Sequence, residues 1–292
     1  SKDVELNLEV CQTDNGGYDN LTLYLNGMAV NVLDKNRALR AKSNNGYNDC
    51  VNFKHLITLA NGENKIGFKA TNKTGEIESN LAQINLNYKG VNNSKPNLYI
   101  LAIGVDKYRD GDLQLKYSVP DAKDITATLT KNTDKLFDKV FTYELLDQDV
   151  TKQNILNKFA SIGKQTNRED VFVLYIAGHG ITDAKTGAYF YLPYDFRYKN
   201  EDSVRTSGVS QEDFTLALSY IQALKSITLI DTCNSGSFAE ALASRGVLQK
   251  TAIDKLVRST GRATLVASSK DQAALEGYDG HGVFTYTVIE AL

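Results

Sequence analysis

The sequence predicts an α/β domain with a mostly parallel sheet and helices on both faces, preceded by a small all-β sandwich domain. Three observations predict this arrangement. Short alternating apolar runs fill residues 1–90, compact apolar runs alternate with helical patterns from residue 98 onward, and a polar segment without periodicity lies between them. The predicted organisation is therefore a sandwich at 1–90, a linker at 91–97 and an α/β domain at 98–292.

The strands of the first domain follow the pattern of half-buried strands. Apolar and polar residues alternate from Glu5 to Val10 and from Leu21 to Leu25. Turn residues that tolerate positive φ separate these runs at strand-plus-turn intervals. They are Asn26-Gly27, Asn45-Gly46, Asn61-Gly62 and Thr74-Gly75. This pattern predicts an antiparallel β-sandwich.

The second domain reads as buried strands joined by helices. Its apolar runs lie at 98–105, 140–146, 171–177, 227–230 and 263–267. Helices are expected from Pro120 to about Asn132 and from Thr151 to about Gly163, because proline suits a first helical turn and threonine caps one. Runs that are apolar on both faces indicate parallel strands covered by helices on two sides.

Composition excludes several classes of function. Hydrophobic residues make up 42% and charged residues 23% of the 292 residues, as in water-soluble globular proteins. The net charge of −2, with scattered basic residues, lacks the footprint of a nucleic-acid binder. The longest apolar stretch, 171–177, is too short to cross a bilayer, so no membrane is expected as a partner. A cytoplasmic location is favoured, although a start at Ser1 leaves room for an upstream segment.

Three cysteines are too few for a disulfide-built scaffold, and none forms a CxxC pair, so no metal site is predicted. Cys11 and Cys50 are candidates for pairing with each other, which the sequence leaves open. Either way, Cys233 remains a single thiol.

Two predicted strands end in residues suited to thiol chemistry. The strand 171–177 runs into Gly178-His179-Gly180, and the strand 227–230 runs into Asp231-Thr232-Cys233. Parallel neighbours place both loops at one edge of the sheet. Because a free thiol is only slightly ionised at neutral pH, Cys233 needs a base, and His179 is the candidate. His281, between two glycines near the end, ranks second as a substrate contact or a turn cap.

These motifs resemble those of the caspase and metacaspase clan. The resemblance rests on Gly-His-Gly after a strand and on Asp-Thr-Cys-Asn-Ser-Gly about fifty residues later. The Asp-x-Cys form is closer to metacaspases and bacterial caspase-like proteins than to animal caspases. The first domain resembles the immunoglobulin-like module that precedes such domains in bacterial proteins. Further matches lie at Ala102–Tyr108, Asp121-Ala122, Ser268–Gln272 and Gly280–Tyr286.

The resemblance implies a cysteine endopeptidase with a Cys233–His179 dyad and an oxyanion hole built from the amides of Gly180 and Cys233. It also implies that Asp121 and Asp231 line the first specificity pocket. Such acids favour Arg or Lys before the scissile bond, because a buried acid pair is costly without a cation.

Ser268 is implied to lie along the substrate backbone, with an ordinary strand end as the alternative. Self-cleavage is expected in the segment 239–261, which carries several basic residues. No cofactor is predicted; calcium activation is the alternative, although no EF-hand spacing exists. The candidate calcium ligands are Asp183, Asp195, Glu201, Asp202, Glu212 and Asp213.

The expected partners are protein or peptide substrates with Arg or Lys at the cleavage position, together with a regulatory protein or an upstream domain. The competing hypothesis is an inactive caspase-like scaffold that only binds protein partners, and it predicts an inert Cys233 thiol. A different thiol enzyme, such as an acyltransferase, would need a cofactor fingerprint that the sequence lacks. The chain ends inside a predicted helix, which leaves open whether residues beyond Leu292 complete the domain.

Overall fold

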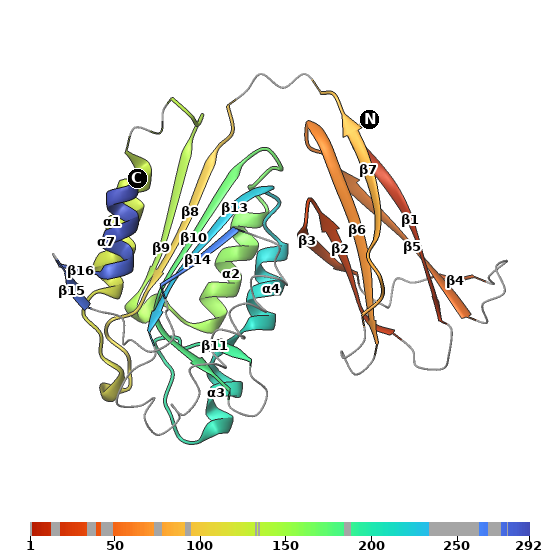
Figure 1. Cartoon of the computed structure of the whole chain (residues 1–292). Coiled ribbons are helices and arrows are strands. Elements are labelled where there is room, and N and C mark those ends of the chain that lie inside the picture. Colours follow the sequence, from red (N-terminus) through yellow and green to blue (C-terminus); the bar gives the residue numbers. More distant parts are fainter. Residues whose placement is uncertain are drawn as a thin grey trace. The chain divides into compact units, whose positions relative to one another are not determined.

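The structure of the chain is a computed structural model, and two compact units, 1–93 and 94–292, make it up (Figure 1). The residues that the structure describes are 2–12, 18–33, 39–41, 49–72, 78–90, 95–131, 133, 135–183, 188–233, 263–267, 276–278 and 280–292.

The first unit consists of two antiparallel sheets with the strand orders β1-β5-β4 and β3-β2-β6-β7. Leu21 of one sheet and Phe53 of the other belong to one buried apolar cluster, so the sheets pack face to face. The strands are β1 (Asp3–Gln12), β2 (Tyr18–Leu25), β3 (Met28–Leu33), β4 (Leu39–Ala41), β5 (Asp49–Thr58), β6 (Gly62–Asn72) and β7 (Ala82–Tyr88).

The predicted Asn-Gly turn joins β2 to β3. Asn26 and Gly27 have φ values of 53° and 84°, the positive values that a two-residue hairpin turn requires. Gly62, with φ 93°, begins β6 as the second residue of another predicted turn. The turns predicted at Asn45-Gly46 and Thr74-Gly75 lie outside the described residues.

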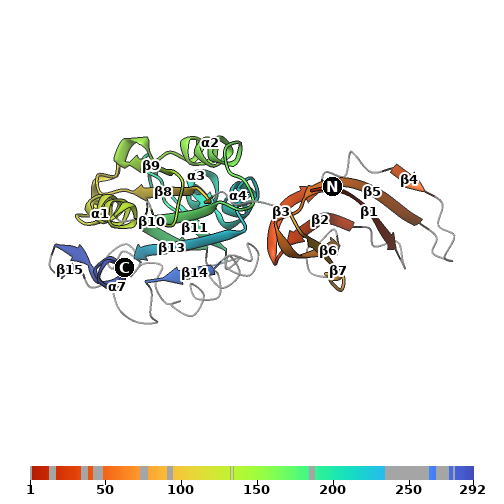
Figure 2. The ribbon, with the colours of Figure 1, turned by 90° about the horizontal axis from the view of Figure 1, so that it is seen from above.

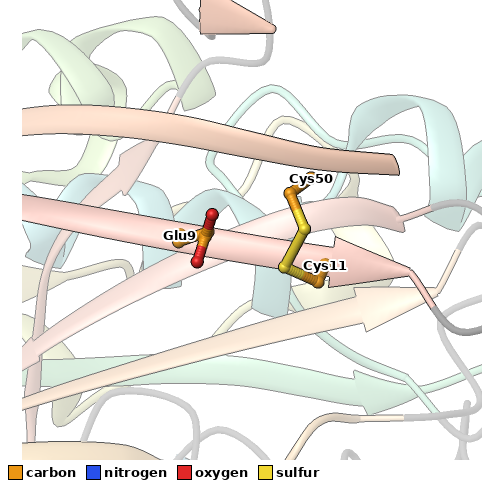
Figure 3. Close-up of side chains that lie close together, drawn as sticks. All are labelled: Glu9, Cys11 and Cys50. Atoms are coloured by element: carbon orange, nitrogen blue, oxygen red, sulfur yellow. A yellow bond between two sulfur atoms is a disulfide. The ribbon is translucent and has the colours of Figure 1, made fainter. Parts of the chain in front are cut away.

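A disulfide joins Cys11 of β1 to Cys50 of β5, which settles the pairing that the sequence left open (Figure 3). The two residues are direct partners in the antiparallel register, with Cα atoms 4.1 Å apart. The cytoplasmic location stays a prediction. No helix among the described residues is long and apolar enough to span a membrane.

The second unit is built on a seven-stranded sheet. Its parallel strands follow the order β9-β8-β10-β13-β14, one after another in Figure 2, and β11 and β12 extend the sheet in the antiparallel direction. The strands are β8 (Leu98–Gly104), β9 (Val140–Leu146), β10 (Val171–Thr182), β11 (Tyr189–Tyr191), β12 (Val209–Ser210), β13 (Lys225–Cys233) and β14 (Ala263–Val266).

Helices cover both faces of this sheet, as predicted. Phe159 of α2 and Phe214 of α4 pack on one face, whereas Ile125 of α1 and Val288 of α7 pack on the other (Figure 1). The helices are α1 (Ser118–Thr130), α2 (Lys152–Gly163), α3 (Glu201–Ser207), α4 (Gln211–Ser219) and α7 (Val283–Ala291), and a small hairpin of β15 (Glu276–Tyr278) and β16 (His281–Gly282) precedes α7.

Two expected boundaries are wrong. The strand predicted to end at Ala177 continues as β10 through Gly178-His179-Gly180 to Thr182, because β11 supplies a pairing partner for the extension. Likewise, β13 continues past Ile230 and includes Cys233 as its last residue. His179 and Cys233, which were predicted to lie in loops, therefore lie on strands. The predicted helix start at Thr151 is confirmed, because its side chain accepts a hydrogen bond from the Asn154 amide.

Candidate active site

Strand β10 changes partners at Gly178, immediately before His179. Up to Ala177 it pairs with β8, and from Gly180 onward it pairs with β11. Gly178 has φ 140°, and a Cβ there would lie 2.8 Å from the Tyr108 hydroxyl oxygen. Only glycine therefore fits this bend, which brings the His179 side chain to the carboxyl edge of the parallel sheet.

The imidazole of His179 is buried and oriented by main-chain and side-chain groups. Its Nε2 lies 3.0 Å from the carbonyl oxygen of Leu113, in the 3₁₀ turn Gly111–Leu113. Because a carbonyl oxygen only accepts hydrogen bonds, Nε2 carries the proton, and in the neutral ring Nδ1 keeps the lone pair. The geometry therefore assigns Nδ1 as the basic atom of His179.

Tyr108 supports His179 from a second direction. The His179 amide donates to the Tyr108 hydroxyl oxygen at 2.8 Å, and the two rings lie 5.0 Å apart between centroids. Both residues are almost fully buried. The position of the imidazole is therefore held through its backbone, its ring face and Nε2.

Cys233 is the direct register partner of His179 in the parallel pair β10–β13. Directly paired residues of adjacent strands lie side by side in the sheet. The sheet thus brings the two predicted catalytic positions together on neighbouring strands. The structure describes Cys233 through its backbone.

The Gly180 amide points to the β13 side of β10. The carbonyl of His179 accepts from the Leu192 amide on the β11 side, and successive peptide groups of a strand alternate in direction. A Cβ on Gly180 would lie 2.7 Å from the Tyr189 ring and 3.0 Å from Thr232 Oγ1, so a side chain has no room there. Ser268, the other predicted substrate contact, lies outside the described residues.

The two acids predicted for the specificity pocket, Asp121 and Asp231, lie together beside Gly282. A Cβ on Gly282 would be 3.0 Å from Asp121 Oδ2 and 3.3 Å from Asp231 Oδ2. Asp121 is 2% exposed and Asp231 is 7% exposed. Two carboxylates are therefore buried at the same end of the sheet as His179 and Cys233.

Each acid is satisfied by donors of the same chain. His281 Nδ1 lies 2.8 Å from Asp121 Oδ1, and the Gly282 amide donates to Asp121 Oδ2 at 3.0 Å. Thr285 donates its hydroxyl to Asp231 Oδ2 at 2.9 Å. The Tyr175 hydroxyl lies 2.6 Å from Thr285 Oγ1. Because the Thr285 hydroxyl already donates to Asp231, Tyr175 is the donor in its contact with Thr285.

Burial sets the protonation of this cluster. It raises the pKa of Asp121, and the hydrogen bonds from His281 and Gly282 oppose that rise. Burial raises the pKa of Tyr175 well above its usual value, and the nearby Asp231 and Asp121 carboxylates add to the effect. Tyr175 therefore stays a hydroxyl donor. The hydrogen bonds to Asp121 do not fully offset the rise of its pKa that burial causes.

The caspase-domain profile, Peptidase C14, matches residues 98–292, which are two thirds of the chain and contain the whole site. The chain belongs to the caspase domain family. A search of curated proteins found no match.

Two solved structures resemble this chain only at a low level. Protein GSU0716 from Geobacter sulfurreducens is 14% identical, with a TM-score of 0.48, and the match covers 67% of this chain and 82% of that one. A family two carbohydrate esterase from Clostridium thermocellum is 10% identical, with a TM-score of 0.33, and the match covers 99% and 89%. The family assignment of the caspase domain rests on the profile match.

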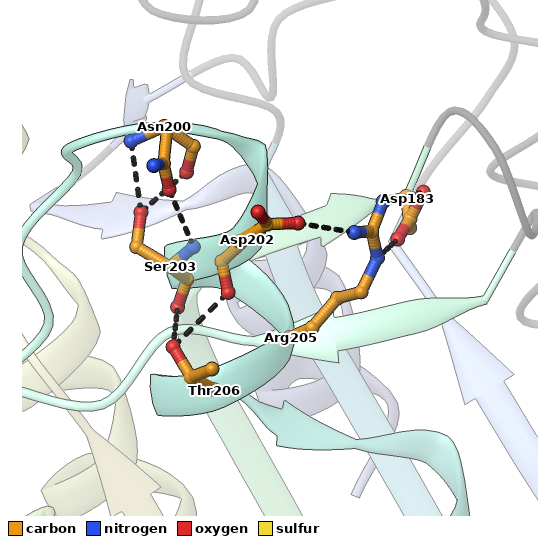
Figure 4. A network of polar contacts seen from close by, with 6 residues as sticks. All are labelled: Asp183, Asn200, Asp202, Ser203, Arg205 and Thr206. Atoms are coloured by element: carbon orange, nitrogen blue, oxygen red, sulfur yellow. Dashed lines mark hydrogen bonds and ion pairs between the residues drawn. The ribbon is translucent and has the colours of Figure 1, made fainter.

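Several candidate calcium ligands of the caspase domain have cationic or capping partners. Arg205 bridges the buried Asp183 and the exposed Asp202 (Figure 4). Asp213 accepts the Ser210 amide at the start of α4 and pairs with Lys152. Calcium activation stays a prediction.

In the described part of the chain, three side chains of the types that bind metals (His, Cys, Asp or Glu) bring their ligand atoms within 4.8 Å of one another at a single place. This place is Glu9 with Cys11 and Cys50 (Figure 3). Both sulfurs there belong to the disulfide and are not thiolates, which are the form of cysteine that binds metals.

Sequence reasoning missed four groups of the caspase site. Tyr108 ended a quoted motif, and Thr285 lay within another, yet neither had been assigned a role. Tyr175 looked like an ordinary buried strand residue. The Leu113 carbonyl is a main-chain atom, so no residue type signals its role.

Proposed function

We propose that this caspase-domain protein is a cysteine endopeptidase that cleaves after Arg or Lys, with Cys233 as nucleophile and His179 as acid and base. The observation that supports it most is the register pairing of His179 with Cys233, combined with an imidazole whose Nδ1 keeps its lone pair. A base next to a thiol raises the thiolate fraction and thus the nucleophilicity.

The proposed reaction follows from these roles. Nδ1 of His179 takes the proton of the Cys233 thiol, and the thiolate attacks the substrate carbonyl. The oxyanion is stabilised by the Gly180 and Cys233 amides. Protonated His179 then gives its proton to the leaving amine, and the acyl-enzyme is hydrolysed by water, which regenerates the thiol. The Leu113 carbonyl stabilises the imidazolium that forms in between.

The specificity part of the proposal rests on Asp121 and Asp231. Two buried carboxylates lie beside one glycine at this sheet edge, and a guanidinium or ammonium is the complementary group. The proposal includes self-cleavage within 239–261, a segment outside the described residues, and no required cofactor.

We also propose that the first unit is an immunoglobulin-like sandwich. The sheet orders β3-β2-β6-β7 and β1-β5-β4 support this, because they match the orders C′-C-F-G and B-E-D of an immunoglobulin sandwich. The disulfide then joins strands B and E of one sheet. This bond favours an oxidising compartment as the working location.

The test is cleavage of fluorogenic peptides with Arg, Lys, Asp or Ala before the bond, with and without calcium. We expect Arg and Lys peptides to be cleaved, and Cys233→Ala and His179→Gln to reduce kcat/KM by about 10³-fold or more. The matched control is His55→Gln, in the first unit, which keeps full activity.

The outcomes separate the alternatives. Cleavage after Asp would retain the peptidase and reject the acidic pocket. Absence of cleavage of all peptides, together with a Cys233 thiol that iodoacetamide labels no faster than free cysteine, would reject the peptidase and leave the scaffold. Calcium-dependent cleavage would reject the proposal that no cofactor is needed.

A further inference from the structure

Two adjacent residues at the corner between β16 and α7 contact both oxygens of the Asp121 carboxylate. His281 Nδ1 and the Gly282 amide contact different oxygens of this carboxylate, at 2.8 and 3.0 Å. Two parallel N–H donors on one carboxylate are the arrangement that an arginine guanidinium makes. In the resting protein, its own chain therefore takes the place that a basic substrate side chain would occupy on Asp121.

Acidic and aromatic residues surround His281. On α1, Asp124 Oδ2 lies 3.8 Å from Nδ1, in addition to Asp121. On the neighbouring elements, Tyr278 of β15 is the register partner of His281 and stacks edge to face with Tyr286 of α7. Glu276 of β15 is the register partner of Gly282, and a Cβ on that glycine would lie 3.3 Å from Oδ2 of Asp231 on β13.

We propose that His281 is a specificity-determining residue that competes with the basic side chain of the substrate for Asp121. This inference rests on the proposed cleavage after Arg or Lys. The His281 side chain is 21% exposed, whereas that of Asp121 is 3% exposed, so the imidazole forms the solvent side of the pair. A guanidinium that reaches Asp121 replaces this imidazole, which leaves by rotation about its side-chain bonds.

The competition depends on the charge of the donor at position 281. A cationic donor holds the Asp121 carboxylate more strongly than a neutral one does, because the pair is then charge-assisted. Binding of a basic side chain and the contact of residue 281 with Asp121 therefore oppose each other, and by linkage each weakens the other by the same factor.

The test uses the full chain and benzamidine, a mimic of the arginine side chain, whose binding is measured by calorimetry. His281→Lys places a permanent cation beside Asp121, and we expect its Kd to be about fivefold or more higher than that of wild type. His281→Gln keeps a neutral donor and binds more tightly than wild type.

Peptide kinetics add a readout that a merely structural role would not move. In His281→Gln, the KM for Arg peptides falls while kcat stays within about twofold. His55→Gln serves as the matched control. Equal Kd and KM values in wild type and both variants, or a benzamidine affinity that is absent in all of them, overturn the inference.

The two proposals fail in different ways. Cleavage after Arg with no effect of either His281 variant removes only the competition. Absence of cleavage with a His281-dependent benzamidine affinity removes the peptidase and retains cation binding at the acid pair. A lower melting temperature in His281→Gln, with unchanged Kd, assigns His281 to the attachment of β16 to α1 and overturns the competition.

Discussion

Tyr108→Phe tests how the position of His179 is maintained. The substitution keeps the ring that packs against the imidazole and removes only the oxygen that accepts the His179 amide at 2.8 Å. Tyr108 is 4% exposed and His179 is 3% exposed, so water does not readily replace the lost acceptor. The change therefore removes the acceptor of this hydrogen bond at the partner-switch point of β10.

The expected magnitude follows from this burial. An unsatisfied buried amide costs about 1–3 kcal/mol of unfolding free energy. For a unit of this size, each kcal/mol lowers the melting temperature by about 2–4 °C. A slight rotation of the imidazole also moves Nδ1 relative to Cys233, and we expect kcat to fall about tenfold with little change in KM.

The assay combines thermal unfolding, followed by circular dichroism, with peptide kinetics. The matched control is Tyr99→Phe, because Tyr99 is equally buried and its hydroxyl donates to the Gln165 carbonyl at 3.1 Å, away from the site. The control should lose less stability, because its hydrogen bond is only partly buried, and keep kcat. A Tyr108→Phe protein with wild-type melting temperature and kcat would refute the reasoning, and an equal loss of kcat in Tyr99→Phe would show that the effect is general.

Three further predictions concern stability. Burial raises the pKa of Asp106 in the folded protein. Its contribution to the unfolding free energy is therefore present below the unfolded pKa and is lost as the pH rises through the folded pKa. Urea unfolding at several pH values should show that wild type loses stability relative to Asp106→Asn as the pH rises through this range. Gly178→Ala forces a side chain into φ 140° and against the Tyr108 hydroxyl, so we expect the unfolding free energy, measured in urea, to fall by more than about 1 kcal/mol. Gly111→Ala, which has open space around it, is the control and should change the unfolding free energy by less than about 0.5 kcal/mol. Replacing Cys11 and Cys50 by alanine removes a link across 39 residues and should lower the unfolding free energy of the first unit by about 3–4 kcal/mol, and an unchanged denaturant midpoint without reductant would contradict this.

Local patterns predicted the layers of the fold but not where its strands end. Alternation and apolar runs report what a residue packs against, so the sheets, α2 and the Asn26-Gly27 turn were accessible from the sequence. The extension of β10 past Ala177 was not, because it depends on pairing with β11, which only the folded chain brings into register. Glycines on both sides of His179 suggested a loop, yet Gly178 serves a change of partner within a strand.

The site divides in the same way. His179 and Cys233 were recognisable as residue types that follow strands, and Asp121 and Asp231 came from the family resemblance. The partners of these acids were not predictable, since Gly282 acts through its amide and through the absence of a side chain. His281 was noted only as a substrate contact or a turn cap, because no local rule places it against a helix 160 residues earlier.

The Cys11–Cys50 disulfide affects how activity should be measured. Thiol peptidases are usually assayed with a reductant that protects the nucleophile, and the same reductant attacks disulfides by thiol exchange. Any change of activity in strong reductant would then combine two opposite effects, a gain from recovery of an oxidised Cys233 and a loss from opening of the first unit. Titrating the reductant, with the Cys11 and Cys50 alanine protein in parallel, separates the two and shows whether the protein works best under mildly oxidising conditions.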